Sequence, residues 1–222
     1  MIGINMENLQ PCEGLEIPKK GVKQRLFQLK ITLRGINPPV WRRVVLSSYT
    51  SFSKLHELIQ EYFSWEGYHL HEFYFPHPKN PRDRVRIMGI IEWDEDVDMS
   101  YYHFLANNVR LCDVLSKDQK RVYYLYDFGD NWIHLIQLEK MYPYDERFVG
   151  PLCVGGKRAA PPEDSGGPYG FQENLKFLEK LNQESVEGIL KWMGKDYDPH
   201  KVKEIGIRLS PKKLEGIFGP SL

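Results

Sequence analysis

The chain of 222 residues is long enough for one ordinary hydrophobic core. Apolar residues make up 41% of it and charged residues 27%, which is a globular composition and excludes a disordered or fibrous protein. Thirty basic residues balance thirty acidic ones, so the formal net charge of zero excludes a global field that would draw the protein to nucleic acid or anionic lipid.

Targeting signals and disulfides are not expected. The stretch from Met1 to Leu15 lacks an apolar run behind a basic start, and no apolar stretch approaches the ~20 residues that a membrane helix needs. Cys12, Cys112 and Cys153 are few, widely spaced and odd in number. We therefore expect a cytoplasmic protein with no membrane contact and no disulfide partner.

The chain opens with an extension and a hairpin. Residues 1–22 contain scattered proline and glycine without apolar periodicity, which predicts a flexible N-terminal extension. Apolar and polar residues alternate from Arg25 to Arg34, as in a half-buried strand. After a Gly and Pro turn, a second strand from Val40 to Leu46 follows closely enough to pair with the first.

A helix is predicted from Phe52 to Phe63, where apolar residues recur at helical spacing. Thr50, Ser51 and Ser53 are each able to cap its start, because a hydroxyl oxygen accepts from free N–H groups of the first turn.

Further strands and a short helix follow. Strands are predicted over His69–Phe75, Val85–Trp93, Val122–Phe128 and Trp132–Lys140, with a short helix over Val109–Leu115. The acidic run 92–98 is interpreted as a solvated loop.

The region 142–170 is rich in proline and glycine and shows no strand or helix period, which predicts a long ordered loop. The C-terminal part, 171–222, is expected to be helical. Its predicted helices are Phe171–Leu181, Val186–Met193, Pro199–Leu209 and a short one after Ser210.

These elements predict one α+β domain over residues 23–222. Its sheet is mixed or antiparallel, is built from hairpins in a β-grasp-like arrangement, and carries one packing helix and C-terminal helices.

Polar residues concentrate on the second hairpin and the long loop. A carboxylate and imidazole set of this kind suits a divalent cation or acid/base chemistry. The alternative is structural, with carboxylates that accept backbone N–H groups of the Gly129 turn. The predicted binding face consists of Asp127, Asp130, Trp132, His134, Glu163 and Asp164.

His69 and His71 are spaced to share one face of a strand and so to chelate a metal. A metal needs a third ligand, for which His134 or Asp127 is the candidate. The alternative is that these histidines make ordinary hydrogen bonds. No cofactor other than a divalent metal is expected.

Basic residues near the first hairpin form a candidate nucleic-acid contact, through Lys23, Arg25, Arg42 and Arg43. The alternative is that they protect an edge strand.

Five motifs in one order resemble the plasmid pRiA4b ORF-3-like family. They are RLFQLKITLRGINPPVWRR (25–43), LHELIQ (55–60), HLHEF (69–73), YDFGDNWIH (126–134) and APPEDSGGPYG (160–170). The resemblance covers about residues 24–209. It implies bacterial and archaeal relatives, often on plasmids or transposons and some labelled resolvase-like, and it brings no activity with it.

One departure from that family pattern matters. Many relatives carry cysteines where this chain has Ala160 and Ser165, with another cysteine that matches Cys153. A zinc or disulfide clip in this loop therefore lacks its thiols.

The function expected from the sequence is a non-enzymatic binding or regulatory role associated with plasmids or mobile elements, with nucleic acid or another protein as partner. Two alternatives stay open: a metal- or carboxylate/histidine-dependent enzyme on a small or phosphorylated substrate, and a nucleic-acid-binding protein.

Overall fold

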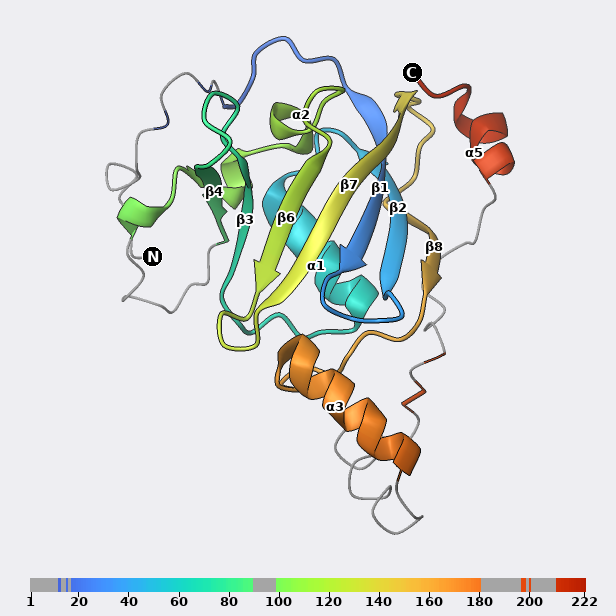
Figure 1. Cartoon of the computed structure of the whole chain (residues 1–222). Helices are drawn as coiled ribbons and strands as arrows, with labels where there is room; N and C mark the ends of the chain where they lie inside the picture. Colours follow the sequence, from blue (N-terminus) through green and yellow to red (C-terminus); the bar gives the residue numbers. More distant parts are fainter. Residues whose placement is uncertain are drawn as a thin grey trace.

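One eight-stranded sheet forms the centre of the molecule (Figure 1). The structure, a computed structural model, describes residues 12, 15, 17–89, 99–180, 197, 198, 200 and 211–222. The strand order is β5-β4-β3-β6-β7-β1-β2-β8. Among the described strands, neighbours run antiparallel except for the β4 and β5 pair, which is parallel.

The elements have the following bounds. The strands are β1 (Arg25–Leu33), β2 (Trp41–Ser47), β3 (His71–Pro76), β4 (Arg84–Met88), β5 (Phe104–Leu105), β6 (Arg121–Tyr126), β7 (Trp132–Pro143) and β8 (Leu152–Lys157). The helices are α1 (Phe52–Phe63), α2 (Leu111–Val114), α3 (Gly167–Lys180) and α5 (Pro211–Phe218), with short 3-10 turns at Met99–Tyr101 and Ala106–Asn108.

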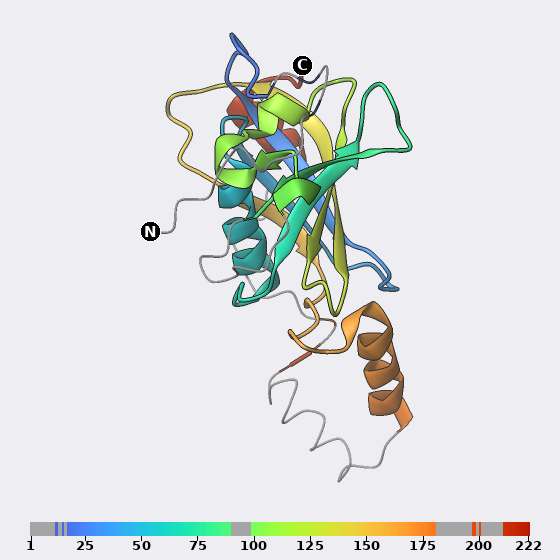
Figure 2. The ribbon, with the colours of Figure 1, turned by 90° about the vertical axis from the view of Figure 1, so that its left-hand side faces the viewer.

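Helix α1 covers one face of the sheet, which we call the inner face (Figure 2). Its apolar side, including Leu55, Ile59 and Phe63, packs with the inward residues of the central strands in the main core. Ser51 caps the helix, because its hydroxyl accepts a hydrogen bond of 3.1 Å from the N–H of Lys54. The main core therefore lies between α1 and the sheet.

The opposite, outer face is covered by α5 at one end. A smaller apolar cluster joins Leu26, Val45, Tyr142 and Val154 of the sheet to Leu214 and Phe218 of the helix. The turns between β1 and β2 and between β3 and β4 project to this outer side (Figure 2).

The local predictions agree well with this architecture. The first hairpin, α1, α2, β6 and β7 lie where the sequence predicts them, within a few residues at their ends. The fold is α+β with a mixed sheet, as expected. The finer prediction of a β-grasp-like arrangement is not confirmed.

Two predictions need correction. The region 142–170 is not one loop, because β8 lies within it and extends the sheet beside β2; its Gly155 and Gly156 hide the strand pattern. Residues 17–22 are anchored: the N–H of Lys19 donates to Asp113 and the hydroxyl of Tyr49 donates to the carbonyl of Val22.

Several predictions lie wholly or mostly outside the described residues, namely the rest of the N-terminal extension, the acidic run 92–98 and the helices over 186–193 and 199–209. In the part of the chain that is described, no helix combines the length and apolar character needed to span a bilayer.

Candidate functional site

The candidate site lies at one end of the sheet, where three segments meet. They are the connection from α1 to β3 (residues 64–70), the β6–β7 turn (127–131) and the loop before α3 (158–166); Figure 1 shows this end beside α3. Each segment contributes one ligand-type side chain, and the three are far apart in sequence.

His69, Asp127 and Asp164 form the centre of this site. The Nε2 atom of His69 lies 3.1 Å from Oδ1 of Asp164 and 3.6 Å from Oδ2 of Asp127. All three ligand atoms lie within 4.8 Å of one another. The Asp164 side chain is 59% exposed and the Asp127 side chain 12%, so the cluster opens to solvent on the Asp164 side.

The turn geometry fixes the Asp127 carboxylate. Its Oδ1 accepts hydrogen bonds of 2.9 Å from the N–H of Gly129 and 3.2 Å from the N–H of Asp130. Asp127 has a left-handed backbone (φ 57°), which aspartate tolerates better than most residues. The other oxygen, Oδ2, is left to face His69.

The Asp164 carboxylate is held in the same manner. The hydroxyl of Tyr68 donates to its Oδ2 over 2.6 Å, while Oδ1 faces His69. This hydrogen bond raises the pKa of Tyr68 above its usual value. Each aspartate thus uses one oxygen for anchoring and presents the other at a common point.

Glu163 and Asp130 anchor the loop and do not face the common point. Glu163 accepts from the hydroxyl of Tyr126 and from the N–H of Glu66, the latter over 2.6 Å. Asp130 accepts from the N–H of Gly166 over 3.1 Å. Burial, followed by the bond to Glu163, raises the pKa of Tyr126. The loop is therefore docked by hydrogen bonds from both neighbouring segments.

A close backbone approach explains the glycine at which α3 begins. Gly167 has a left-handed φ of 67°, and a Cβ there would lie 2.3 Å from the carbonyl oxygen of Asp130. Only glycine allows the loop to lie this close to the turn.

Trp132 and His134, which the sequence assigned to the binding face, lie in the core beneath it. Both have no exposed surface, and the ring of His134 packs edge-on against Phe63 (4.7 Å) and Trp65 (5.2 Å). Burial lowers the pKa of His134 to about 3. Trp132, His134 and Ile136 are spaced two residues apart, and strand residues with this spacing share a face of the sheet. The apolar Ile136 was therefore a signal in the sequence that Trp132 and His134 point into the core.

The predicted metal-binding set of His69, His71 and His134 is divided among three places. Strand β3 begins at His71, so His69 lies before it and the alternation argument does not apply. His71 is buried and stacks on His56 at 3.6 Å, and burial lowers the pKa of His71 to about 3 and of His56 to about 4. Of the three, His69 alone joins the carboxylates.

The predicted nucleic-acid residues do not form one surface. Arg42 is 2% exposed and donates to the carbonyl oxygens of Tyr62 (2.9 Å) and Arg158 (3.0 Å), so it ties α1 to the end of β8. Arg43 makes a two-bond ion pair with Glu139 at 2.6 and 2.9 Å. Lys23 is exposed and Arg25 half-buried at the start of β1.

Among the described residues the three cysteines form no disulfide clip, and a serine stabilises the loop at one of the positions where relatives carry cysteine. Cys12, Cys112 and Cys153 are not joined in a disulfide in the part of the chain that the structure describes. Ser165 donates its hydroxyl to the carbonyl of Pro162 over 2.7 Å, which stabilises the loop without a thiol.

Comparison with known proteins identifies relatives across most of the chain. The family model described as plasmid pRiA4b ORF-3-like protein matches residues 25–204. The uncharacterised protein y4hQ of Sinorhizobium fredii (strain NBRC 101917 / NGR234) is 36% identical over 180 residues, which cover 78% of this chain and 84% of that protein. A crystal structure of the protein of unknown function MM3350 from Methanosarcina mazei Go1 is similar with a TM-score of 0.69 and 35% identity, covering 86% of this chain and 97% of the other.

Proposed function

The chain belongs to the plasmid pRiA4b ORF-3-like family, and we propose that within this family it is a binding protein that holds a divalent metal ion at His69, Asp127 and Asp164. The observation that carries the proposal is the convergence of one imidazole nitrogen and two carboxylate oxygens, from three separate segments, on one partly open point.

The spacing of these atoms is close to what a metal requires. Ligand atoms around a tetrahedral ion with bonds of about 2.1 Å lie about 3.4 Å apart. The distances from His69 to the two carboxylates are 3.1 and 3.6 Å. In the alternative, His69 forms an ordinary ion pair with Asp164 while Asp127 accepts the N–H groups of its own turn. That alternative does not require the second oxygen of Asp127 to face the same nitrogen at 3.6 Å.

The anchoring of the ligands favours the same proposal. Outer hydrogen bonds that orient the ligands are typical of metal sites. Here the backbone of the β6–β7 turn orients Asp127, and Tyr68 orients Asp164. Both carboxylates are therefore held before an ion arrives, which reduces the entropy lost on binding.

The donor set favours Zn²⁺ or Mn²⁺. One imidazole and two carboxylates suit a borderline ion better than Ca²⁺, which takes six to eight oxygen ligands. Three protein ligands leave at least one coordination position for water or a further ligand. Because both oxygens of Glu163 already accept hydrogen bonds, this neighbour is not free as a general base, and we favour a binding or regulatory role over a hydrolytic one.

The proposal is tested by calorimetric titration of the chelator-stripped full chain with Zn²⁺ and with Mn²⁺. We expect one ion per chain, and a loss of affinity of more than about tenfold in Asp164→Asn and His69→Gln. Asp118→Asn is the matched control, because it changes an exposed acid before β6. The proposal fails if neither ion binds, or if the two site variants bind as tightly as the control.

A further inference from the structure

In the part of the chain that the structure describes, the outer face of the sheet is largely uncovered. Helix α1 packs on the inner face (Figure 2). Helix α5 covers the outer face at the end where Leu26 and Tyr142 lie. The remainder of the outer face lies between the two projecting turns.

A row of side chains crosses this face. Residues that are paired across neighbouring strands point to the same side of a sheet. One residue each of β3, β6, β7, β1 and β2 is paired with the next in this order. The row consists of Tyr74, Tyr123, Leu135, Thr32 and Trp41. Except for Tyr74, these side chains are only half-buried. The distance from Tyr123 to Trp41 is three strand spacings, about 14 Å.

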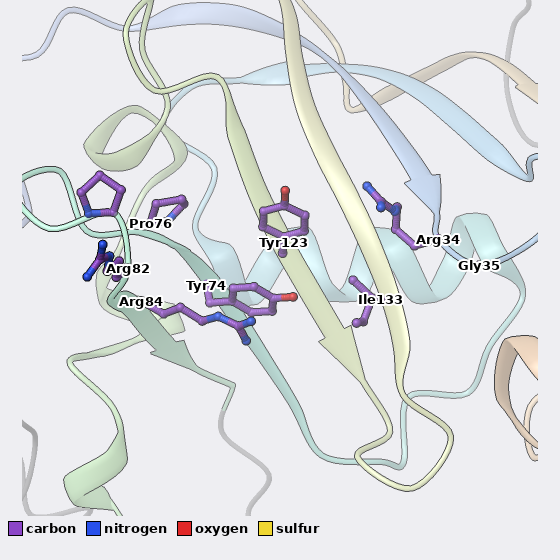
Figure 3. Close-up of a pocket in the computed structure, with 9 residues that line it drawn as sticks. Arg34, Gly35, Tyr74, Pro76, Arg82, Arg84, Tyr123 and Ile133 are labelled. Carbon is purple, nitrogen blue, oxygen red and sulfur yellow. The ribbon is translucent and has the colours of Figure 1, made fainter.

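A pocket of about 550 Å³ lies at the Tyr74 end of the row. Tyr74, Tyr123 and Ile133 form its floor, and the two tyrosine rings are stacked at 5.1 Å and 11°. Arg34 borders it from the end of β1, and Arg82 and Arg84 from the β3–β4 hairpin (Figure 3).

The charged residues that line the pocket are all positive. Arg34, Arg82 and Arg84 make no ion pair with any carboxylate among the residues described, and no acidic residue lines the pocket. By contrast, Arg86 on the same face is neutralised by Glu72 at 2.5 Å. In a chain of zero net charge, these three guanidinium groups concentrate positive charge at one place on the surface.

Cations also lie on the aromatic rings at both ends of the row. The guanidinium of Arg84 lies 4.6 Å from the centre of the Tyr74 ring. At the other end, Lys30 and Arg43 lie 5.2 and 5.0 Å from the Trp41 ring; Arg43 is paired with Glu139, so Lys30 supplies the positive charge there. The outer face therefore repeats one combination, an aromatic ring beside a positive charge.

We propose that this outer face binds single-stranded nucleic acid, with phosphates on Arg34, Arg82 and Arg84 and bases along the row from Tyr123 to Trp41. An open sheet with aromatic rings across its strands is a surface on which unpaired bases stack, and guanidinium groups bind phosphate. A duplex buries its base faces and leaves the aromatic row unused. An acidic peptide would satisfy the arginines but not the row.

The test is fluorescence anisotropy of the full chain with labelled oligothymidylate and oligouridylate, and with a duplex of equal length. EDTA is present throughout, so the result does not depend on the proposed metal. We expect both single strands to bind more tightly than the duplex. Replacing Tyr123 by Leu should weaken binding about tenfold, while Tyr123→Phe, which keeps the ring, should stay within about twofold.

The charge contribution is measured separately. Binding of single strands weakens with salt by a logarithmic slope of about 0.7 for each phosphate contact. The double variant Arg34→Gln, Arg84→Gln should therefore reduce the slope by about 1.4, whereas Arg147→Gln, an arginine on the exposed β7–β8 connection, should leave it unchanged.

Three results would overturn the proposal: no binding of either single strand at low salt, tighter binding of the duplex, or pocket variants that behave like the Arg147 control. Circular dichroism and thermal melting of each variant show whether it is folded, and a binding loss counts only for a folded one.

Discussion

His134 is a polar side chain that the fold keeps neutral in its core. Neither ring nitrogen has a hydrogen-bond partner among the described residues, and burial lowers the pKa of His134 to about 3. In the unfolded chain the pKa of histidine is near 6.5. Between these two pH values His134 is protonated in the unfolded state but neutral in the folded state. The free energy of unfolding therefore decreases as the pH falls.

We predict that His134→Leu, which has a similar volume, removes this acid sensitivity. The free energy of unfolding should depend on pH less steeply between pH 6 and pH 4, by about 1.4 kcal/mol per pH unit. At pH 7 the variant should be nearly as stable as the parent or more stable, because two buried polar atoms without partners are removed.

Urea unfolding at several pH values measures this slope. Ile136→Val on the same buried side of β7 is the control, since it lowers stability at every pH alike. An unchanged slope in His134→Leu would show that the histidine is not held neutral.

At the scale of elements, α1 illustrates how local chemistry sets both ends of a helix. Of the three hydroxyl residues at its start, Ser51 is the cap and accepts from the N–H of Lys54. The helix ends at Phe63 and is capped by Ser64, which has a left-handed backbone (φ 60°) and donates its N–H to the carbonyls of the last turn. The two caps therefore set the length of the apolar side that packs against the sheet.

We predict that Ser51→Ala lowers the free energy of unfolding by about 1 kcal/mol, because it leaves a first-turn N–H without an acceptor. Ser53→Ala is the matched control and should have little effect, since Ser53 makes no capping bond. Thermal and urea unfolding measure both. Equal losses in the two variants would contradict the assignment of the cap.

At the scale of the whole molecule, the candidate metal site depends on docking of the loop 158–166. Glu163 bonds to Tyr126 on β6 and to the backbone of Glu66, and Trp65 donates to the carbonyl of Pro161 over 2.8 Å. These contacts join residues about 37 to 97 positions apart in sequence. The position of Asp164 beside His69 is a consequence of this docking.

We predict that Glu163→Ala releases the loop without unfolding the protein. Amide hydrogen exchange of residues 158–166 should become faster, while that of the central strands stays protected. Affinity for the proposed Zn²⁺ should fall about tenfold, because Asp164 is no longer held in place. Glu146→Ala, at an exposed acid of the β7–β8 connection, is the control, and unchanged loop exchange in Glu163→Ala would refute the docking role.

The sequence by itself determined the elements whose period is local. Alternation fixed the first hairpin and β7, and helical spacing fixed α1, because strand and helix periods depend on neighbouring residues only. Composition, and not a period, led us to expect Asp127, Asp130, Glu163 and Asp164 on one face, since they belong to the Gly129 turn and to the region rich in proline and glycine.

The tertiary structure alone decided which of these side chains meet. The turn that contains Asp127 leaves one of its oxygens free, whereas the free oxygen of Asp164 depends on the hydrogen bond from Tyr68 in another segment. The burial of His134 likewise depends on the helix above it. The aromatic row on the outer face depends on registers between distant strands. A local pattern shows which side of a strand a residue takes, but the neighbours on that side are set by packing of segments far apart in the chain.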